Sequence, residues 1–164
     1  MDYLWTPWRY QYVTGAGGKG ECVFCVAGRE EQDRENLVVH RAERNFIILN
    51  RFPYTNGHVM IVPYGHEATL TALEPGTLSE MMLLARDVER HLRELYRPDG
   101  VNMGLNIGRA AGAGIADHVH MHALPRWIGD TNFMTATGET RVLPENLEVT
   151  WERLRNAFEQ PAGR

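Results

Sequence analysis

Three histidines alternate with apolar residues in the run His118-Val119-His120-Met121-His122 of this 164-residue chain. In a β-strand, residues two apart share one face. The three imidazoles are therefore expected on one side, with Val119 and Met121 on the other. Histidine titrates near neutral pH, which suits it to nucleophilic, acid–base or ligand roles. We interpret the run as a functional strand; the simpler alternative is a solvated strand face with incidental histidines.

A loop rich in glycine and alanine, residues 109–117, leads directly into this strand. Glycine has no Cβ, so the backbone N–H groups of Gly112, Ala113 and Gly114 can approach an anion closely. Asn106 lies on the polar face of the strand expected before the loop. Taken together, these features predict an anion site beside the histidines, although the loop alone would be an ordinary flexible connection.

Periodicity places strands and helices along the rest of the chain. Alternating or continuous apolar runs predict strands at residues 37–40, 44–50, 58–62, 101–108 and 118–127. A 3.6-residue apolar stripe predicts a long helix over 78–96, with Thr77 and Glu80 at the spacing of a capping box. Shorter helices are expected after His66 and near 145–158. Hairpins with packed helices indicate an α+β fold with an antiparallel sheet.

The length suits a single domain over residues 1–164. Residues 1–20 form an arm rich in aromatic residues and glycine. We expect it to dock on the body or on a second subunit, because Trp5 and Trp8 would be costly to leave in water. Residues 135–164 form a C-terminal extension.

The charge balance limits the classes of partner. A formal net charge of −4 disfavours nucleic-acid binding over a large surface, because such binding needs a basic face. A compact nucleotide pocket needs only a few donors and stays compatible with this charge. No apolar run approaches the ~20 residues of a membrane span, and the first residues lack the pattern of a signal peptide. We expect a cytoplasmic protein that binds neither nucleic acid nor membranes.

The chain has two cysteines, Cys22 and Cys25, three positions apart. In a reducing compartment this spacing indicates metal or redox chemistry rather than a structural disulfide. The alternatives are a reduced, metal-free pair and a thioredoxin-like motif, for which the surrounding sequence lacks a βαβ pattern.

Residues 106–127, with Asn106, the glycine loop and the three alternating histidines, resemble the signature of the histidine triad (HIT) superfamily. The block Gly57-His58-Val59-Met60-Ile61-Val62-Pro63 and the Cys22-x-x-Cys25 pair extend the resemblance over most of the first 130 residues. The opening Trp5-Thr6-Pro7-Trp8-Arg9 and residues 129–134 resemble the bacterial branch related to diadenosine tetraphosphate (Ap4A) phosphorylases and hydrolases. The resemblance implies a HIT-like sheet of about five strands with a long packed helix and a C-terminal helix.

For catalysis, the resemblance implies that His120 attacks the α-phosphorus of a nucleotide and forms a nucleotidyl-histidine intermediate. We expect a backbone carbonyl of the glycine loop to hold the other ring N–H of His120. His122 and the loop N–H groups would stabilise charge on the phosphoryl oxygens. His58 would complete the polar network, and His118 is the first member of the triad.

The resemblance also implies a nucleotide site. Asn50 matches the position that usually holds the ribose, and Asn106 matches one near the phosphates. The complete expected set is Asn50, Asn106, Gly112, Ala113, Gly114, His120 and His122. Taken singly, His58 could be a partly buried histidine whose hydrogen bonds are satisfied within the fold, and Asn50 could be a turn residue.

One departure from the family concerns the leaving group. Many members carry Gln, Ser or Thr between the loop glycine and the triad, whereas residues 113–117 here contain neither a hydroxyl nor an amide side chain. Asp117 is the only polar residue there. This departure favours nucleoside polyphosphates, whose leaving groups need little protonation, over phosphoramidates.

The resemblance supplies two further metal ligands, because some members complete the cysteine pair with histidines at the positions of His66 and His118. Zinc in structural sites takes four Cys or His ligands in a tetrahedron. A zinc ion bound by Cys22, Cys25, His66 and His118 would hold the N-terminal segment against the catalytic strand. Family members also commonly form homodimers through the long helix and a sheet edge.

Two other functions fit the same residues. One is a metalloenzyme in which His118, His120 and His122 bind a catalytic metal. The other is a nucleotide-binding or signalling module without turnover. Within the enzyme class, the acceptor is water, inorganic phosphate or a sugar phosphate, and an adenosine phosphoramidate is an alternative substrate. The triad alone does not choose among them.

Overall fold

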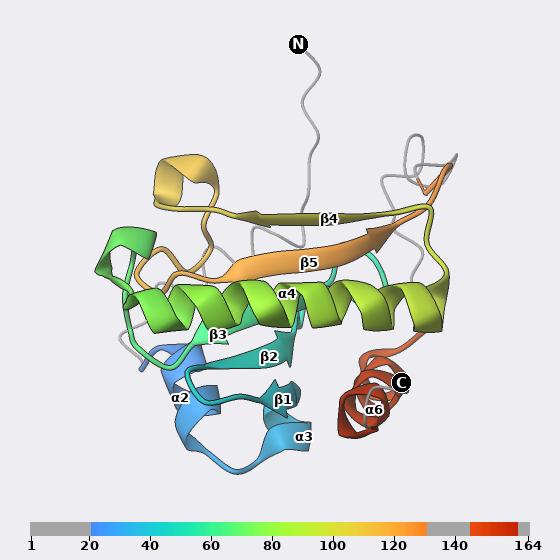
Figure 1. Cartoon of the computed structure of the whole chain (residues 1–164), viewed down its shortest axis with the longest axis horizontal. Helices are drawn as coiled ribbons and strands as arrows, with labels where there is room; N and C mark the ends of the chain where they lie inside the picture. Colours follow the sequence, from blue (N-terminus) through green and yellow to red (C-terminus); the bar gives the residue numbers. More distant parts are fainter. Residues whose placement is uncertain (1–20, 131–144, 161–164) are drawn as a thin grey trace.

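The computed structural model describes residues 21–130 and 145–160 (Figure 1). The aromatic arm and the first part of the C-terminal extension lie outside these ranges. Five antiparallel strands form one sheet in the order β1-β2-β3-β5-β4. They span Val38–Arg41 (β1), Asn45–Leu49 (β2), Val59–Pro63 (β3), Gly100–Leu105 (β4) and Met121–Arg126 (β5). The predicted α+β class is confirmed.

The exchanged order of the last two strands positions the site. β4 follows β3 along the chain but lies at the sheet edge, and β5 returns between them. As a result, His122 on β5 pairs with Met60 on β3. The His58 block and the triad, 60 residues apart in sequence, thereby become neighbours.

The helices and turns outside the sheet include two helices that the sequence did not predict. They are α2 (Val23–Arg29), α3 (Asp33–Asn36), α4 (Pro75–Tyr96) and α6 (Leu147–Glu159), with 3-10 turns η1 (Leu70–Ala72) and η2 (Arg109–Ala111). The unpredicted α2 and α3 have seven and four residues. Segments this short do not develop a recognisable helical stripe.

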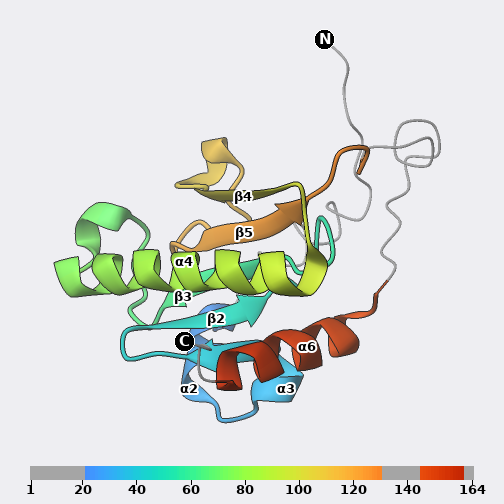
Figure 2. The same cartoon turned by 45° about the vertical axis from the view of Figure 1, so that its right-hand side comes forward.

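Two apolar layers cover the two faces of the sheet. The predicted stripe of α4 packs on one face, where it buries Met81, Leu84, Ala85, Val88 and Leu92 together with Val119, Met121 and Ala123. The other face holds a smaller cluster built from Phe24 and Ala27 of α2 with residues of β1 to β3. Figures 1 and 2 show α4 crossing the sheet, with α2 near the β1 end. The alternation predicted for the histidine strand is therefore confirmed on its apolar side.

The predicted capping box of α4 is wrong. The helix begins at Pro75, and its N-cap, Glu74, makes no side-chain cap hydrogen bond. Thr77 is buried inside the first turn. The Glu80 carboxylate instead accepts hydrogen bonds from the turn between β1 and β2: from the Arg44 amide at 2.9 Å and the Asn45 side chain at 2.7 Å. The Glu80 carboxylate, which a capping box would use at the start of the helix, therefore binds the turn before β2 instead.

Glu80→Ala is expected to lower the free energy of unfolding by about 1–3 kcal/mol, because the turn amides and the buried Asn45 side chain lose a charged acceptor. Urea denaturation measures the change. Glu89→Ala removes an exposed carboxylate that pairs with Arg93 on the same helix, and its effect is expected within about 0.5 kcal/mol. Equal effects of the two substitutions would contradict the role assigned to Glu80.

β4 is less buried than its alternating pattern predicts. Val101 and Leu105 pack against the core, whereas Met103 is 39% exposed and Ile107, beyond the end of the strand, is 42% exposed. β4 is an edge strand, so the backbone N–H and C=O groups along its outer side do not pair with a neighbouring strand of this sheet.

None of the helices in the described ranges has the length and apolar character needed to cross a membrane.

Candidate functional site

The histidine run lies at the start of β5. The strand begins at Met121, three residues later than predicted. His118 is fully buried and His120 is 3% exposed, while His122 is half-buried and lies within the strand. The ring centroids of His120 and His122 are 4.9 Å apart. The structure thus places His120 and His122 side by side, as the sequence predicted.

One hydrogen bond orients the imidazole of His120. Its Nδ1 lies 2.8 Å from the backbone carbonyl oxygen of His118. A carbonyl accepts only, so Nδ1 carries the proton and Nε2 keeps its lone pair. The predicted orienting carbonyl therefore exists, but it comes from the triad itself and the assignment to the glycine loop is wrong. In extended backbone, the carbonyl two residues earlier lies within reach of the ring.

Burial keeps His120 neutral. Desolvation lowers the pKa of the His120 imidazole below its ordinary value, and the hydrogen bond to His118 opposes this shift only in part. The neutral ring is the form that can act as a nucleophile.

His58 joins the triad through His122. The His58 Nε2 lies 3.0 Å from His122 Nδ1, and the Tyr54 amide donates to His58 Nδ1 at 3.2 Å. Because Nδ1 of His58 accepts, its Nε2 carries the proton and donates to His122. His122 then bears its own proton on Nε2, where it can donate to an anion. Asn50 also belongs to this network, with its Nδ2 3.4 Å from His58 Nδ1.

Phe24 is a site residue that sequence reasoning missed. It is 2% exposed, and its ring centroid lies 4.9 Å from that of His120 and 5.4 Å from that of His118. The residue lies on α2, between Cys22 and Cys25. Its position inside the cysteine pair is the sequence signal that could have drawn attention to it.

The four predicted metal ligands converge. The ligand atoms of Cys22, Cys25, His66 and His118 all lie within 4.8 Å of one another. The Cys25 sulfur is 3.1 Å from His66 Nδ1, and the Cys22 sulfur is 3.4 Å from His118 Nδ1. In a tetrahedral zinc site, the bond lengths place neighbouring ligand atoms about 3.3–3.8 Å apart. The donor set therefore fits zinc, with the 3.4 Å distance inside this range and the 3.1 Å distance just below it.

His118 is oriented for this role. Its Nε2 lies 2.9 Å from the carbonyl oxygen of Pro63, so it donates there and leaves Nδ1 to face the sulfur atoms. Histidine ligands of metals commonly donate their second N–H to a backbone carbonyl. Within the described ranges, no group of potential ligands combines His118 with His120 and His122. The geometry therefore disfavours the catalytic-metal alternative.

The glycine loop is more structured than predicted. It contains η2, and Gly108 and Gly112 adopt φ values of 82° and 89°, which a side chain would strain. The Gly112 amide donates to Arg109 at 3.0 Å and the Ala113 amide to Gly108 at 3.4 Å. These two amides must exchange partners before they can bind a phosphate. Gly114 and Asp117, which precede the triad in the sequence, are exposed.

Asn106 follows the end of β4 rather than lying on its polar face, and it is half-buried. In the part of the chain that the structure describes, no hydrogen bond joins its side chain to the triad. Its place near the phosphates remains an expectation.

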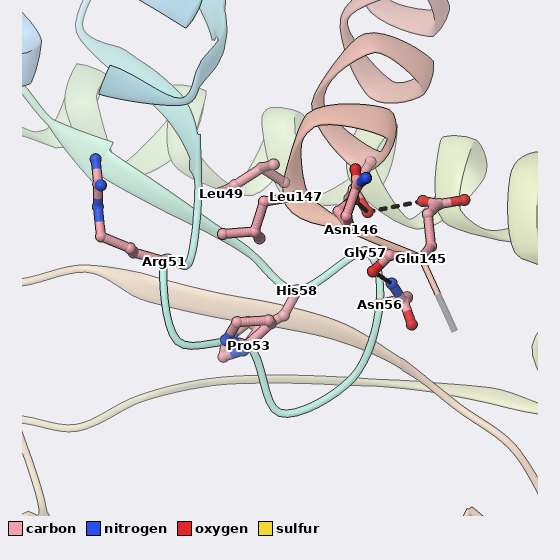
Figure 3. A pocket seen from close by; sticks show the side chains of 10 residues that line it. Leu49, Arg51, Pro53, Asn56, Gly57, His58, Glu145, Asn146 and Leu147 are labelled. Carbon is pink, nitrogen blue, oxygen red and sulfur yellow. Dashed lines mark hydrogen bonds between the residues drawn. The ribbon is translucent and has the colours of Figure 1, made fainter. Parts of the chain in front are cut away.

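A cavity of about 310 Å³ lies beside His58, between the loop from β2 to β3 and the start of α6 (Figure 3). Asn56 links these two segments, because its Nδ2 donates to the Glu145 carbonyl oxygen at 2.7 Å. The lining residues are Leu49, Arg51, Pro53, Asn56, Gly57, His58, Glu145, Asn146, Leu147 and Thr150. His120 is not among them, so the cavity adjoins the triad network through His58 alone.

Comparisons with known proteins agree with this geometry. The family model described as the HIT domain matches residues 31–127. A Mycobacterium tuberculosis protein named AP-4-A phosphorylase is 36% identical over 157 residues, which cover 92% of this chain and 80% of that relative. A HIT-like protein of Mycoplasma pneumoniae is 29% identical and covers 81% of this chain and 89% of its own length.

Solved structures show the same fold. A Zn-bound histidine triad family protein from Mycobacterium smegmatis superimposes with a TM-score of 0.67 and 30% identity, covering 85% of this chain and 94% of that one. A histidine triad nucleotide-binding protein from Sulfolobus tokodaii gives a TM-score of 0.66 and 27% identity, over 84% of this chain and 92% of its own. The chain belongs to the HIT domain family.

Proposed function

We propose that this protein is a nucleotide hydrolase or phosphorylase that acts on the α-phosphate of a nucleoside polyphosphate such as Ap4A, with His120 as covalent nucleophile. The observation that carries the proposal is the hydrogen bond from His120 Nδ1 to the His118 carbonyl, which leaves Nε2 for phosphorus. The similarity to a relative named AP-4-A phosphorylase supports the substrate class.

The reaction would proceed in two displacements. Nε2 of His120 forms a bond to the α-phosphorus while the bond to the bridging oxygen breaks, and the polyphosphate leaves, as ATP from Ap4A. An acceptor oxygen then attacks phosphorus, the N–P bond breaks, and the imidazole is regenerated. Water as acceptor gives AMP and a proton, whereas inorganic phosphate gives ADP. Splitting the transfer in this way replaces one hard step by two easier ones.

The remaining triad groups would bind the phosphate. His122, which can donate from Nε2, would stabilise the charge that develops on the phosphoryl oxygens. His58 would keep His122 in that tautomer through the 3.0 Å contact. We further propose that Asn50 binds the ribose and that Asn106 and the amides of residues 112–114 contact the phosphates.

We also propose that zinc binds Cys22, Cys25, His66 and His118 in a structural role. Zinc, when bound, would stabilise the fold by joining α2 to the start of β5. The 3.1 Å and 3.4 Å spacings between sulfur and Nδ1 atoms support this site, as does the likeness to the Zn-bound protein of Mycobacterium smegmatis.

The acid limb of the pH profile is expected below pH 6.5. A buried histidine with a lowered pKa stays neutral, and hence nucleophilic, until the pH falls below that pKa. Histidine ordinarily titrates at about 6.5, so kcat/KM should still exceed half of its plateau value at that pH. The profile of kcat/KM reports the free enzyme. A half-maximal value at or above pH 6.5 would contradict the proposed neutral nucleophile.

Turnover of Ap4A with and without inorganic phosphate tests the function. The zinc-loaded protein is incubated with Ap4A and the nucleotides are separated by chromatography. ADP plus ATP formed only with phosphate identifies a phosphorylase. AMP plus ATP formed without phosphate identifies a hydrolase, and two ADP formed without phosphate also identify a hydrolase but place the attack away from the α-phosphate. Binding of AMP with no turnover of Ap4A or of an adenosine phosphoramidate would support the non-enzymatic module instead.

We propose a homodimer for this protein. Exposed apolar side chains lie on two elements: Met82 and Leu83 on α4, and Met103 with Ile107 at the β4 edge. A second copy of the chain would cover them and pair the free edge. Met103→Lys is expected to shift the protein from dimer to monomer in light scattering. A monomeric parent protein would overturn this proposal.

A further inference from the structure

One side chain of β1 holds the C-terminal end of α2. Arg41 donates from Nη1 to the Gly28 carbonyl at 2.8 Å and from Nη2 to the Ala27 and Glu30 carbonyls at 2.8 and 2.6 Å. The last carbonyls of a helix have no partners within it, and a cation is favourable at this end. A seven-residue helix is not stable by itself. Its place therefore depends on contacts of this kind.

A carboxylate extends the contact to the C-terminal helix. The Nε of Arg41 donates to Asp33 Oδ1 at 2.8 Å, and Arg155 of α6 donates to Asp33 Oδ2 at 2.9 Å. Arg155 also reaches the Val39 carbonyl at 3.3 Å. These three side chains are only 22–30% exposed. They form a chain of ion pairs, Arg41–Asp33–Arg155, hereafter the brace. α3 and α6 both contact β1, and Figure 1 shows α2 close to the same strand.

The helix that the brace holds carries half of the candidate metal site. Cys22 is the N-cap of α2 and Cys25 lies within it, while His66 comes from the loop after β3 and His118 from the segment just before β5. Phe24, which covers the His120 ring, lies on the same helix. A shift of α2 therefore changes the distances between the two thiolates and the two imidazoles.

We propose that Arg41 is a positioning residue for the metal site and that α6 reinforces it through Arg155 and Asp33. The inference rests on the zinc site of the proposed function. α6 lies outside residues 31–127 that match the family model, so the brace links a C-terminal addition to the metal ligands. Without Arg41 the ligand set is less preorganised, and part of the binding energy is spent on ordering α2.

Zinc affinity and local hydrogen exchange test the brace. Zinc is titrated against a chromophoric chelator for the parent, Arg41→Met and Arg155→Met, and amide exchange of α2 is followed in the metal-free proteins. Arg41→Met is expected to weaken zinc binding about tenfold, in the range found when groups that support metal ligands are removed. It should also speed exchange in α2 while exchange in α4 stays unchanged. Arg155→Met should weaken zinc binding and speed exchange in α2 in the same direction, but by a smaller amount.

The matched control is Arg93→Met, which breaks an exposed ion pair with Glu89 on α4 and should leave zinc affinity and α2 exchange unchanged. If Arg41→Met does not fold, Arg155→Met decides, since it alters only the far end of the brace. Parent-like zinc affinity and parent-like α2 exchange in the decisive variant would overturn the brace. A parent protein that binds no zinc overturns the zinc site of the proposed function as well, which distinguishes the two failures.

Discussion

Replacing His120 by alanine is expected to lower turnover of Ap4A by about 10⁴- to 10⁶-fold, the loss seen when a covalent nucleophile is removed. Among the described residues, neither of the other two triad histidines can take its place. His118 faces the cysteines through Nδ1, and His122 accepts from His58 at its own Nδ1. Steady-state kinetics, with melting curves to show that the variant folds, measure the effect.

His40→Gln is the control for this experiment. His40 is a half-buried histidine on β1 whose ring stacks on Phe158 of α6, and the proposed reaction does not use it. Its replacement should leave kcat within about twofold of the parent, because β2 and β3 separate β1 from β5 in the sheet. If His120→Ala kept the rate of His40→Gln, covalent catalysis at His120 would be rejected.

Cys25→Ser is expected to cause the largest loss of stability. With zinc at 100 to 1,000 times its dissociation constant, a ligand that binds only the folded chain contributes about 3–4 kcal/mol. For a domain of this length, losing that amount lowers Tm by about 10 °C. Scanning calorimetry measures the shift.

Chelation of the parent protein is the matched comparison. A chelator should lower its Tm by a similar amount, whereas Cys25→Ser should no longer respond to the chelator, because both treatments remove the same ion. A parent Tm that does not depend on zinc or chelator would contradict the structural role proposed for the metal.

The sequence predicted the elements that have a long or strict pattern. The apolar stripe of α4 and the alternating apolar residues around His120 can be recognised in the sequence because these residues face the core at regular intervals. The structure places both sets in the core as predicted. The short helix α2 carried no such pattern, because its role depends on Cys22, Cys25 and Phe24 meeting residues far along the chain.

Local motifs failed where a distant partner competed for the same group. Thr77 and Glu80 have the spacing of a capping box, yet Glu80 binds the turn before β2. The carbonyl that orients His120 belongs to His118, which depends on the backbone geometry at the start of β5. The pairing of β3 with β5, which brings His58 to His122, depends on the strand order and could be predicted only through the family resemblance.

Trapping the intermediate tests the central claim most directly. The protein is mixed with Ap4A without phosphate, quenched in alkali within milliseconds to seconds, and digested for mass spectrometry. Alkali preserves the N–P bond, which is labile in acid. The account predicts an adenylyl group on the peptide that contains His120, and its absence from His120→Ala. An adduct on another residue, or full turnover with no adduct at any time point, would contradict the account.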